Sequence, residues 1–370
     1  MKKILALMLS LALCVMVLAG CSGAGAGGDA ANMKVAMVTD YGDITDQSFN
    51  QTTYEACKAW AEANKVDFNY FKPASDSNED RVSMIEKAVD EGYTVIVMPG
   101  YAFGPAIEKT AGEYPDVTFI ALDVSAGDFS ADYKIPANLY SAVYQEELCG
   151  YMAGYAAVKL GYTKLGFLGG MAVPAVVRYG YGFVQGADAA AAELGADVEL
   201  NYAYGNQFYG DADITAAMDT WYAAGTQVVF ACGGGIYTSA AEAAQKVGGK
   251  VIGVDVDQAA TIDGLYGAGM TITSAMKGLG ATVNTMLTAV KEGKFEGGKI
   301  DTLGLVSDTP AENYVQLAPS TQFGAGFTED DYNALVKAMN AGTIKVSNDI
   351  SISAADNAKV LKVNDQGNIK

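Results

Sequence analysis

Short apolar runs alternate with longer amphipathic runs from Met33 onward. The short runs are rich in β-branched residues and have the length of strands, whereas the longer runs have the apolar spacing of helices. Apolar strands that alternate with helices are typical of βαβ units, whose parallel sheets are buried on both faces. The predicted strands are Val35–Thr39, Phe68–Phe71, Thr94–Met98, Val117–Asp123, Leu165–Gly169, Glu199–Tyr204, Val228–Cys232 and Val251–Asp255.

The strand–helix repeats fall into two groups, one from Met33 to about Tyr144 and one from Lys164 to about Asp257. Each group is large enough for its own doubly wound sheet, so we predict an α/β protein with two lobes. The main predicted helices are Ser48–Ala63, Glu79–Glu91, Glu146–Leu160, Val176–Leu194, Asp213–Ala224 and Tyr237–Lys246.

Later segments are expected to return to either sheet and to make the chain cross between the lobes. They comprise strand-like runs at Met270–Met276 and Ile300–Ser307 and helices at Leu279–Glu292 and Glu329–Asn340. We assign 33–144 plus about 271–300 to lobe 1 and 145–270 plus about 301–346 to lobe 2. The sequence leaves the placement of 347–370 open.

The composition narrows the possible functions. Of the 370 residues, 50% are apolar and 18% are charged, which suits a folded chain, and a net charge of −19 disfavours nucleic-acid binding. The absence of histidine excludes Ser-His-Asp and Cys-His mechanisms and imidazole metal sites. The five cysteines are scattered without a CxxC pair, so we expect no metal and no cofactor.

The first residues predict export and a lipid anchor. A basic Met1–Lys3 precedes the apolar run Ile4–Gly20, as in a secretory signal. Leu18–Cys21 looks like the lipobox of bacterial lipoproteins, so residues 1–20 are the expected signal peptide and Cys21 the lipidated residue. The alternatives are a plain signal peptide or an N-terminal membrane anchor. Residues 21–32, in which Ser22–Ala31 is almost all Gly and Ala, would form a flexible tether at the extracytoplasmic side of the cell membrane.

Ligands of open parallel sheets bind beyond the carboxyl ends of the strands. Polar and aromatic residues gather in the loops that follow the predicted strands of both lobes. Two lobes that face each other with such loops would form a cleft. These loops are Asp40–Asn50, Pro99–Phe103, Asp123, Gly169–Pro174, Gly233–Gly235 and Asp255–Gln258.

The same loops carry a resemblance to the basic membrane protein family of bacterial substrate-binding lipoproteins, which includes the purine nucleoside receptor A type. Two segments are specific for this family in combination, namely Asp-Gln-Ser-Phe-Asn-Gln and Gly-Val-Asp-Val-Asp-Gln. The resemblance extends over about Met33 to Val346. The matching segments are Val38–Asp40, Asp46–Gln51, Gly166–Met171, Pro174, Arg178–Tyr179, Gly182–Phe183, Gly186, Gly253–Gln258, Thr273–Ser274 and Lys277.

This resemblance implies a type I periplasmic-binding fold, in which two α/β lobes are joined by a hinge. It also implies a lipid-anchored substrate-binding protein of an ABC importer, which is not an enzyme. Such a protein binds purine nucleosides such as inosine, guanosine or adenosine between its lobes and delivers them to a permease and its ATPase. The family commonly has Phe at the position of Tyr179, where the ring stacks on the base.

Four candidate ligand-binding residues lie in lobe 1. Asp40 is either a ligand contact or a turn cap, and nearby Asp46 is expected to be an N-cap. The resemblance gives Phe49 a stacking role, although an aromatic there is ordinarily core. Asn50 offers amide donors and an acceptor to a heterocycle, and Asp123, at a buried strand end, would accept from ring N–H groups or cap its loop.

Three further candidates, Tyr179, Gly234 and Asp255, lie in the predicted lobe 2, and a fourth, Lys277, lies in the late segment assigned to lobe 1. Gly234 would allow the backbone to approach a sugar or base, but no Lys-Ser/Thr follows as a Walker loop requires. Asp255 is expected to bind ribose hydroxyls, with Asp257 beside it as a cap, because alternate strand residues point to opposite faces and make a poor acid–base pair. Lys277 would hold a sugar oxygen unless it is solvated, and Tyr179 would stack on the base.

Two alternative functions stay open at the level of sequence. The same fold could bind another small molecule such as a sugar. It could also serve as a sensory or surface-interaction lipoprotein. An anchored nucleoside hydrolase or phosphorylase is disfavoured, because the sequence shows no acid–base pair with a metal or phosphate site.

Overall fold

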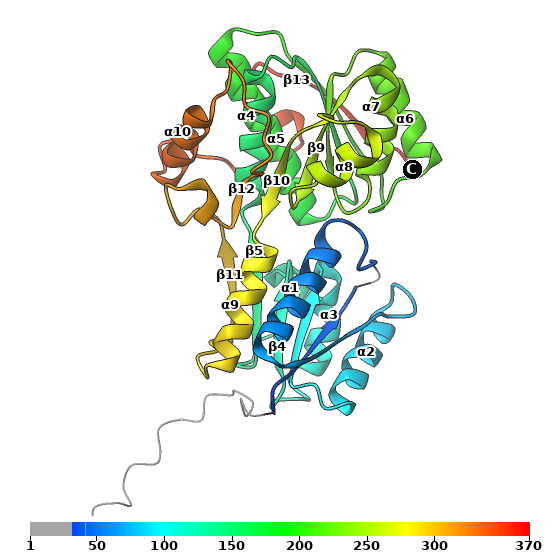
Figure 1. Ribbon diagram of the computed structural model, residues 1–370, viewed down its shortest axis with the longest axis vertical. Coiled ribbons are helices and arrows are strands. Elements are labelled where there is room, and N and C mark those ends of the chain that lie inside the picture. The colour runs from blue at the N-terminus through cyan, green and yellow to red at the C-terminus, as the bar shows by residue number, and fades with distance from the viewer. Residues whose placement is uncertain (1–31, 41) are drawn as a thin grey trace, which may run out of the picture.

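The computed structural model describes residues 32–40 and 42–370 as two lobes, each with a wholly or mainly parallel sheet and helices on both faces (Figure 1). The predicted signal peptide, lipidated Cys21 and nearly all of the predicted tether lie outside the described residues. Within the described residues, no helix combines the length and the apolar character that a membrane crossing requires.

Lobe 1 contains a six-stranded sheet in the order β11-β5-β4-β3-β1-β2, in which every pair of neighbours is parallel. Its strands are β1 (Lys34–Val38), β2 (Asp67–Phe71), β3 (Val95–Pro99), β4 (Thr118–Leu122), β5 (Leu139–Tyr144) and β11 (Lys299–Leu303). Its helices are α1 (Phe49–Asn64), α2 (Asn78–Asp90), α3 (Gly104–Thr110) and α9 (Leu279–Lys291), of which α9 packs on α1.

Lobe 2 contains a seven-stranded sheet in the order β12-β10-β9-β8-β6-β7-β13, parallel except for β10 and β12. Its strands are β6 (Lys164–Gly169), β7 (Glu199–Tyr204), β8 (Val228–Cys232), β9 (Lys250–Asp255), β10 (Thr271–Lys277), β12 (Val315–Leu317) and β13 (Lys362–Asn368). Its helices are α4 (Glu146–Lys159), α5 (Pro174–Leu194), α6 (Ala212–Ala223), α7 (Tyr237–Val247), α8 (Ala259–Tyr266) and α10 (Glu329–Asn340).

The chain passes between the lobes three times. It leaves lobe 1 after β5 to begin α4, returns from β10 into α9, and leaves again from β11 toward β12. The three connections run side by side at one edge of the molecule (Figure 1). They form the hinge that the two-lobed architecture requires.

The structure corrects the predicted lobe boundaries. The strand at 271–277 was expected in lobe 1, but β10 pairs with β9 and therefore belongs to lobe 2. Conversely, β11 joins lobe 1 by pairing with β5, although residues after about 300 were assigned to lobe 2. An apolar run identifies a strand, but it does not identify the neighbour with which the strand pairs.

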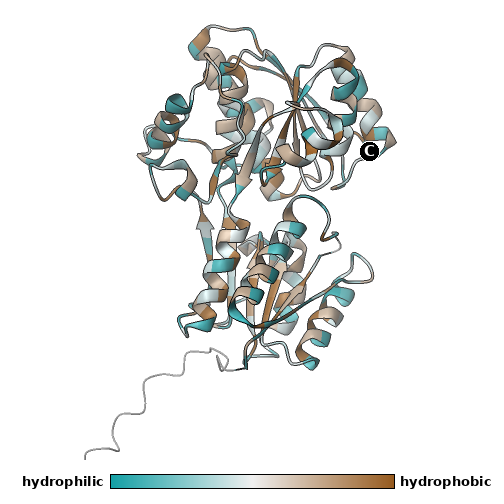
Figure 2. Ribbon diagram, viewed as in Figure 1, coloured by the Kyte–Doolittle hydropathy of each residue, from teal (hydrophilic) through white to brown (hydrophobic). Residues whose placement is uncertain are grey.

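The apolar residues lie where the alternating pattern predicts them. The central strands of both sheets are apolar and the outer helix faces hydrophilic (Figure 2). One cluster of buried residues runs from the lobe 1 sheet through the hinge into α4, α5 and the lobe 2 sheet. Separate clusters fill the remaining face of each sheet. The carboxyl ends of both sheets face the gap between the lobes.

Candidate functional site

A cavity of about 380 Å³ lies between the lobes at the carboxyl ends of the strands. This volume falls within the range of small-molecule sites. All eight residues predicted to bind ligand line this cavity: Asp40, Phe49, Asn50, Asp123, Tyr179, Gly234, Asp255 and Lys277. The topology therefore brings residues more than 200 positions apart to one site.

Asp46 organises the lobe 1 wall at the start of α1. The N-cap of α1 is Ser48 and not Asp46 as predicted, but the Asp46 carboxylate accepts hydrogen bonds from the backbone N–H groups of Ser48, Asn50 and Gln51 at 2.9–3.0 Å. It also accepts from Asn50 Nδ2 at 3.2 Å. The buried Asn50 Oδ1 has no partner among the described residues. Asp46 thus holds the Nδ2 group of Asn50, a residue that lines the cavity.

Asp123 follows β4 in an unusual backbone conformation, with φ of 62°. A positive φ is uncommon for a residue with a side chain and marks a constrained position. Its Oδ2 accepts a hydrogen bond of 2.6 Å from Lys277 Nζ. Its buried Oδ1 finds no partner in the described part of the chain. Two residues that line the cavity from lobe 1 therefore carry buried acceptors without a partner in the described part of the chain, Asn50 Oδ1 and Asp123 Oδ1.

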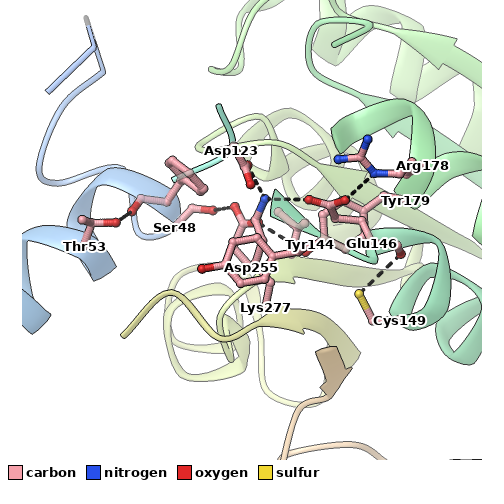
Figure 3. Close-up of polar contacts among 12 residues, drawn as sticks. Ser48, Thr53, Asp123, Tyr144, Glu146, Cys149, Arg178, Tyr179, Asp255 and Lys277 are labelled. Carbon is pink, nitrogen blue, oxygen red and sulfur yellow. Dashed lines mark hydrogen bonds and ion pairs between the residues drawn. The ribbon is translucent and has the colours of Figure 1, made fainter. Parts of the chain in front are cut away.

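Lys277 lies among three carboxylates at the hinge side of the cavity (Figure 3). Its Nζ is 2.6 Å from Asp123, 3.4 Å from Glu146 and 3.7 Å from Asp255. Arg178 Nε adds a second cation, 2.6 Å from Glu146 Oε2. We call Asp123, Glu146, Arg178, Asp255 and Lys277 the charged cluster. Its members belong to both lobes, and Glu146 and Lys277 lie at two of the chain crossings.

The charged cluster keeps Lys277 protonated. Burial opposes the charge on Lys277, but Asp123, Asp255 and Glu146 outweigh it and raise the pKa of the amine above its usual value. Burial raises the pKa values of Asp255 and Glu146, and the neighbouring cations oppose this effect. Burial also raises the pKa of Glu147, whose Oε2 lacks a hydrogen bond within the described residues, to about 7.

Asp255 links the two lobes directly. It ends β9 with φ of 64°, and its Oδ2 accepts a hydrogen bond of 2.6 Å from Ser48 Oγ in lobe 1. The hydroxyl of Tyr179 donates to Oδ1 over 3.4 Å (Figure 3). The family that the sequence resembles commonly has Phe at this position. The additional hydroxyl of Tyr179 therefore contacts the carboxylate that is predicted to hold ribose. Asp257, in contrast, accepts from the backbone N–H of Ala259 at 3.2 Å and from Ser320 Oγ at 2.6 Å, while the N-cap of α8 is Gln258.

Aromatic side chains line the cavity from both lobes. Phe49 lies with its ring centroid 4.8 Å from Lys277 Nζ. Tyr179 is only 2% exposed, because Phe230 packs edge-on against its ring. Phe208 is more exposed and was not predicted. It follows β7 by four residues and packs over Gly170 and Gly233, where a side chain would collide with its ring.

Close packing of α4 on α5 sets the position of several site residues. A Cβ on Gly150 would overlap the Tyr179 carbonyl, and one on Gly182 would overlap the Glu147 carbonyl. The glycines therefore let the two helix backbones touch. This contact fixes Glu146, at the start of α4, relative to Arg178 and Tyr179 on α5.

Ion binding finds no support in the described residues, which contain no group of three or more metal-ligating side chains arranged around one point. The three carboxylates of the charged cluster are already bridged by Lys277. Cys57, Cys149 and Cys232 are unpaired and buried, and burial raises the pKa of the Cys232 thiol at the cavity wall well above its usual value. The arrangement is suited to holding a neutral polar molecule.

Over residues 33–310, the chain matches the Bmp family, described as ABC transporter substrate-binding protein PnrA-like. The ABC transporter nucleoside-binding protein BmpA of Lactococcus lactis is 30% identical over 326 residues, 82% of this chain and 89% of that protein. Basic membrane protein A of Borreliella burgdorferi is 31% identical over 312 residues, covering 82% and 85%.

The fold also matches solved structures. An ABC transporter solute-binding protein from Aeropyrum pernix matches with a TM-score of 0.67 and 21% identity over 85% of this chain and 87% of that one. The two lobes and their hinge are those of the type I periplasmic-binding fold, as the sequence resemblance implied.

Proposed function

Because the chain belongs to the Bmp family of PnrA-like ABC transporter substrate-binding proteins, we propose that its ligand is a purine nucleoside bound between the lobes. The observation that carries this proposal is the pair of unpaired buried acceptors on lobe 1, Asn50 Oδ1 and Asp123 Oδ1, which belong to residues that line a cavity with aromatic walls. Unpaired buried acceptors favour a ligand that brings N–H or O–H donors.

The base would lie against the aromatic walls. Phe49 of lobe 1 and Tyr179 of lobe 2 are the predicted stacking residues. On the lobe 2 side, Phe208 adds a ring that is more exposed than that of Tyr179. Asn50 and Asp123 would accept from the edge of the base. Guanosine offers N1–H and an adjacent amino group to these acceptors, so it suits them better than a base with a single donor.

The ribose would lie toward the charged cluster. Asp255 can accept from sugar hydroxyls, and Lys277 can donate to a sugar oxygen. Asp40 and Gly234 line the same cavity and would complete the contacts from the two lobes. Gly234 has φ of 50° and lies against Phe208, so its backbone can approach a ligand closely.

Titration calorimetry on the full chain tests this proposal. Guanosine, inosine and adenosine are added in turn, with ribose and arabinose as sugar controls. We expect saturable binding of the nucleosides and none of the free sugars. Saturable binding of a sugar without any nucleoside binding would refute the nucleoside assignment and favour the sugar alternative.

We further propose that the protein is a lipoprotein, anchored through Cys21 on the extracytoplasmic side of the membrane, and that it delivers its ligand to an ABC permease and ATPase. The lipobox-like Leu18–Cys21 supports the anchor, and the family supports the transporter. Cys21→Ala should abolish labelling by a fatty-acid probe. A variant that is still labelled and processed normally would disprove the anchor.

A further inference from the structure

Two glutamines of the family-like segments, Gln47 and Gln258, do not line the cavity. They instead contact each other across the gap between the lobes. Gln258 Nε2 donates a hydrogen bond of 3.0 Å to the backbone carbonyl of Gln47. Thr261 Oγ1 donates one of 3.0 Å to Gln47 Oε1. These contacts join the N-terminal end of α1 to that of α8, which face each other in Figure 1.

The lobe 2 side of this contact is rigidly held. Gln258 is 1% exposed, and its Oε1 accepts from the backbone N–H of Val254 at 2.9 Å. Its own backbone N–H donates to Ser274 Oγ at 3.1 Å. The side chain is therefore fixed within lobe 2, and its remaining amide donor is directed at lobe 1.

The lobe 1 side is held in an equally specific way. Gln47 has φ of 56°, a conformation that residues with side chains rarely adopt. Gln51 stabilises it, because its Oε1 accepts from both Gln47 N and Gln47 Nε2, at 3.0 and 2.7 Å. This arrangement turns the Gln47 carbonyl and Oε1 toward α8. Each lobe thus presents a prepared half of the contact.

We infer that Gln47, Gln258 and Thr261 form an interlobe latch that stabilises the closed arrangement of the lobes without touching the ligand. Its hydrogen bonds exist only while the lobes are close together. A closed state that is favoured by the protein itself raises the apparent affinity for every ligand that requires closure, and by the same factor. The latch therefore sets affinity and residence time, whereas the cavity sets selectivity.

Two substitutions break the latch from the lobe 2 side. Thr261→Val removes one hydroxyl donor at nearly constant volume. Gln258→Glu retains an oxygen for the Val254 N–H but places a second oxygen opposite the Gln47 carbonyl. Gln245→Glu is the matched control, because Gln245 also donates its Nε2 to a backbone carbonyl, that of Tyr266, but within lobe 2.

The first readout needs no ligand. Hydrogen–deuterium exchange of the full chain is followed in peptides that cover residues 47–51 of lobe 1. Both variants should accelerate exchange there although the substitutions lie in lobe 2, by about 2- to 10-fold for Thr261→Val, which loses one hydrogen bond. The Gln245→Glu control should leave it unchanged. Unchanged exchange in both latch variants would overturn the inference.

The second readout uses guanosine and inosine as probes and therefore rests on the proposed function. Thr261→Val should weaken both by the same factor, about 2- to 10-fold, with most of the change in the dissociation rate. A loss confined to one nucleoside would assign these residues to ligand recognition and overturn the latch. If neither nucleoside binds the unmodified protein, the proposed ligand is wrong, and the exchange experiment still decides whether the latch exists.

Discussion

Two regions join the lobes across the cleft, and they use opposite chemistry. The charged cluster contains two cations among three carboxylates. Its Glu146, Asp255 and Lys277 are buried, and Glu146 and Lys277 lie at two of the chain crossings. The interlobe latch of Gln47, Gln258 and Thr261 is neutral and joins two helix ends away from the crossings. Ser48 and Asp255 connect the two regions through a single hydrogen bond.

The difference follows from what opening the cleft requires of each region. A buried ion whose partner is removed is strongly destabilised, so charges belong where the lobes move least. A neutral hydrogen bond is exchanged for bonds to water at a net change of only about 1 kcal/mol. Neutral groups are therefore suited to a contact that forms and breaks in every binding cycle.

The substitution expected to have the largest effect is Lys277→Met. It leaves Asp123, Glu146 and Asp255 without their shared cation, and we expect a loss of about 3–5 kcal/mol in the free energy of unfolding at neutral pH. Urea denaturation measures this loss. Lys246→Met, which breaks an exposed pair with Asp219, should change stability by at most about 1 kcal/mol. Equal effects would show that burial does not distinguish the cluster.

Glu147 sharpens the comparison, because it is a buried carboxyl beside the cluster without a bridging cation. Its pKa of about 7 lies above the usual 4.5, so the folded state favours the protonated form. This contribution to stability is present at low pH and is lost as the pH rises toward and beyond 7. Glu147→Gln should remove that loss. Between about pH 4 and pH 8, the free energy of unfolding of this variant should rise by about 3 kcal/mol relative to that of the unmodified protein.

The check is urea denaturation of both proteins across that pH range. The exposed Glu193, whose pKa is lowered by the Tyr155 hydroxyl and Lys159, supplies a control of opposite sign. The free energy of unfolding of Glu193→Gln should not rise relative to that of the unmodified protein as the pH is raised. Parallel pH profiles for Glu147→Gln and the unmodified protein would mean that Glu147 is ionised in the fold.

Substitution of Asp255 tests the residue that connects the charged cluster, through Ser48, with the interlobe latch. Asp255→Asn should weaken guanosine about tenfold or more, because a carboxylate that accepts from ribose hydroxyls is lost in a closed cleft. Free guanine has no ribose and should lose much less. Calorimetry with both ligands measures the difference. Equal losses for base and nucleoside would remove Asp255 from the ribose site.

The smallest expected effect concerns the hydroxyl of Tyr179. Tyr179→Phe keeps the ring but removes the donor to Asp255, so it should cost about 0.5–1.5 kcal/mol in guanosine binding. Tyr179→Ala should weaken guanosine and guanine alike, because the wall of the cavity is lost. If Tyr179→Ala binds both ligands normally, the base does not contact this wall.

Much of the fold was predictable because parallel strands buried on both faces are nearly continuous apolar runs. The segment predicted as a helix at Glu329–Asn340 has the bounds of α10. The strand β13 was not predicted, because its sequence KVNDQGN is polar and mostly exposed. Its place at the edge of the sheet comes from pairing with β7, which no local pattern reveals.

The candidate site was predictable to the extent that its residues directly follow strands. Phe208 was missed, because it lies four residues after β7 in a loop with no recognisable motif. Glu146 was assigned only to a helix, because its contact with Lys277 bridges 131 positions of sequence. The contact between Gln47 and Gln258 bridges 211 positions, so both residues were noted as part of a motif but were given no role.

The three chain crossings have a consequence for the order of synthesis. A ribosome releases the chain from its N-terminus, so β1–β5 emerge before α9 and β11, which complete lobe 1. Until then the edge of β5 is unpaired and able to associate with other chains. Lobe 2 in turn receives β13 only at residues 362–368. Neither lobe can therefore complete its sheet as an independent early unit, and the two are expected to become stable together, once the last strands of the chain are available for pairing.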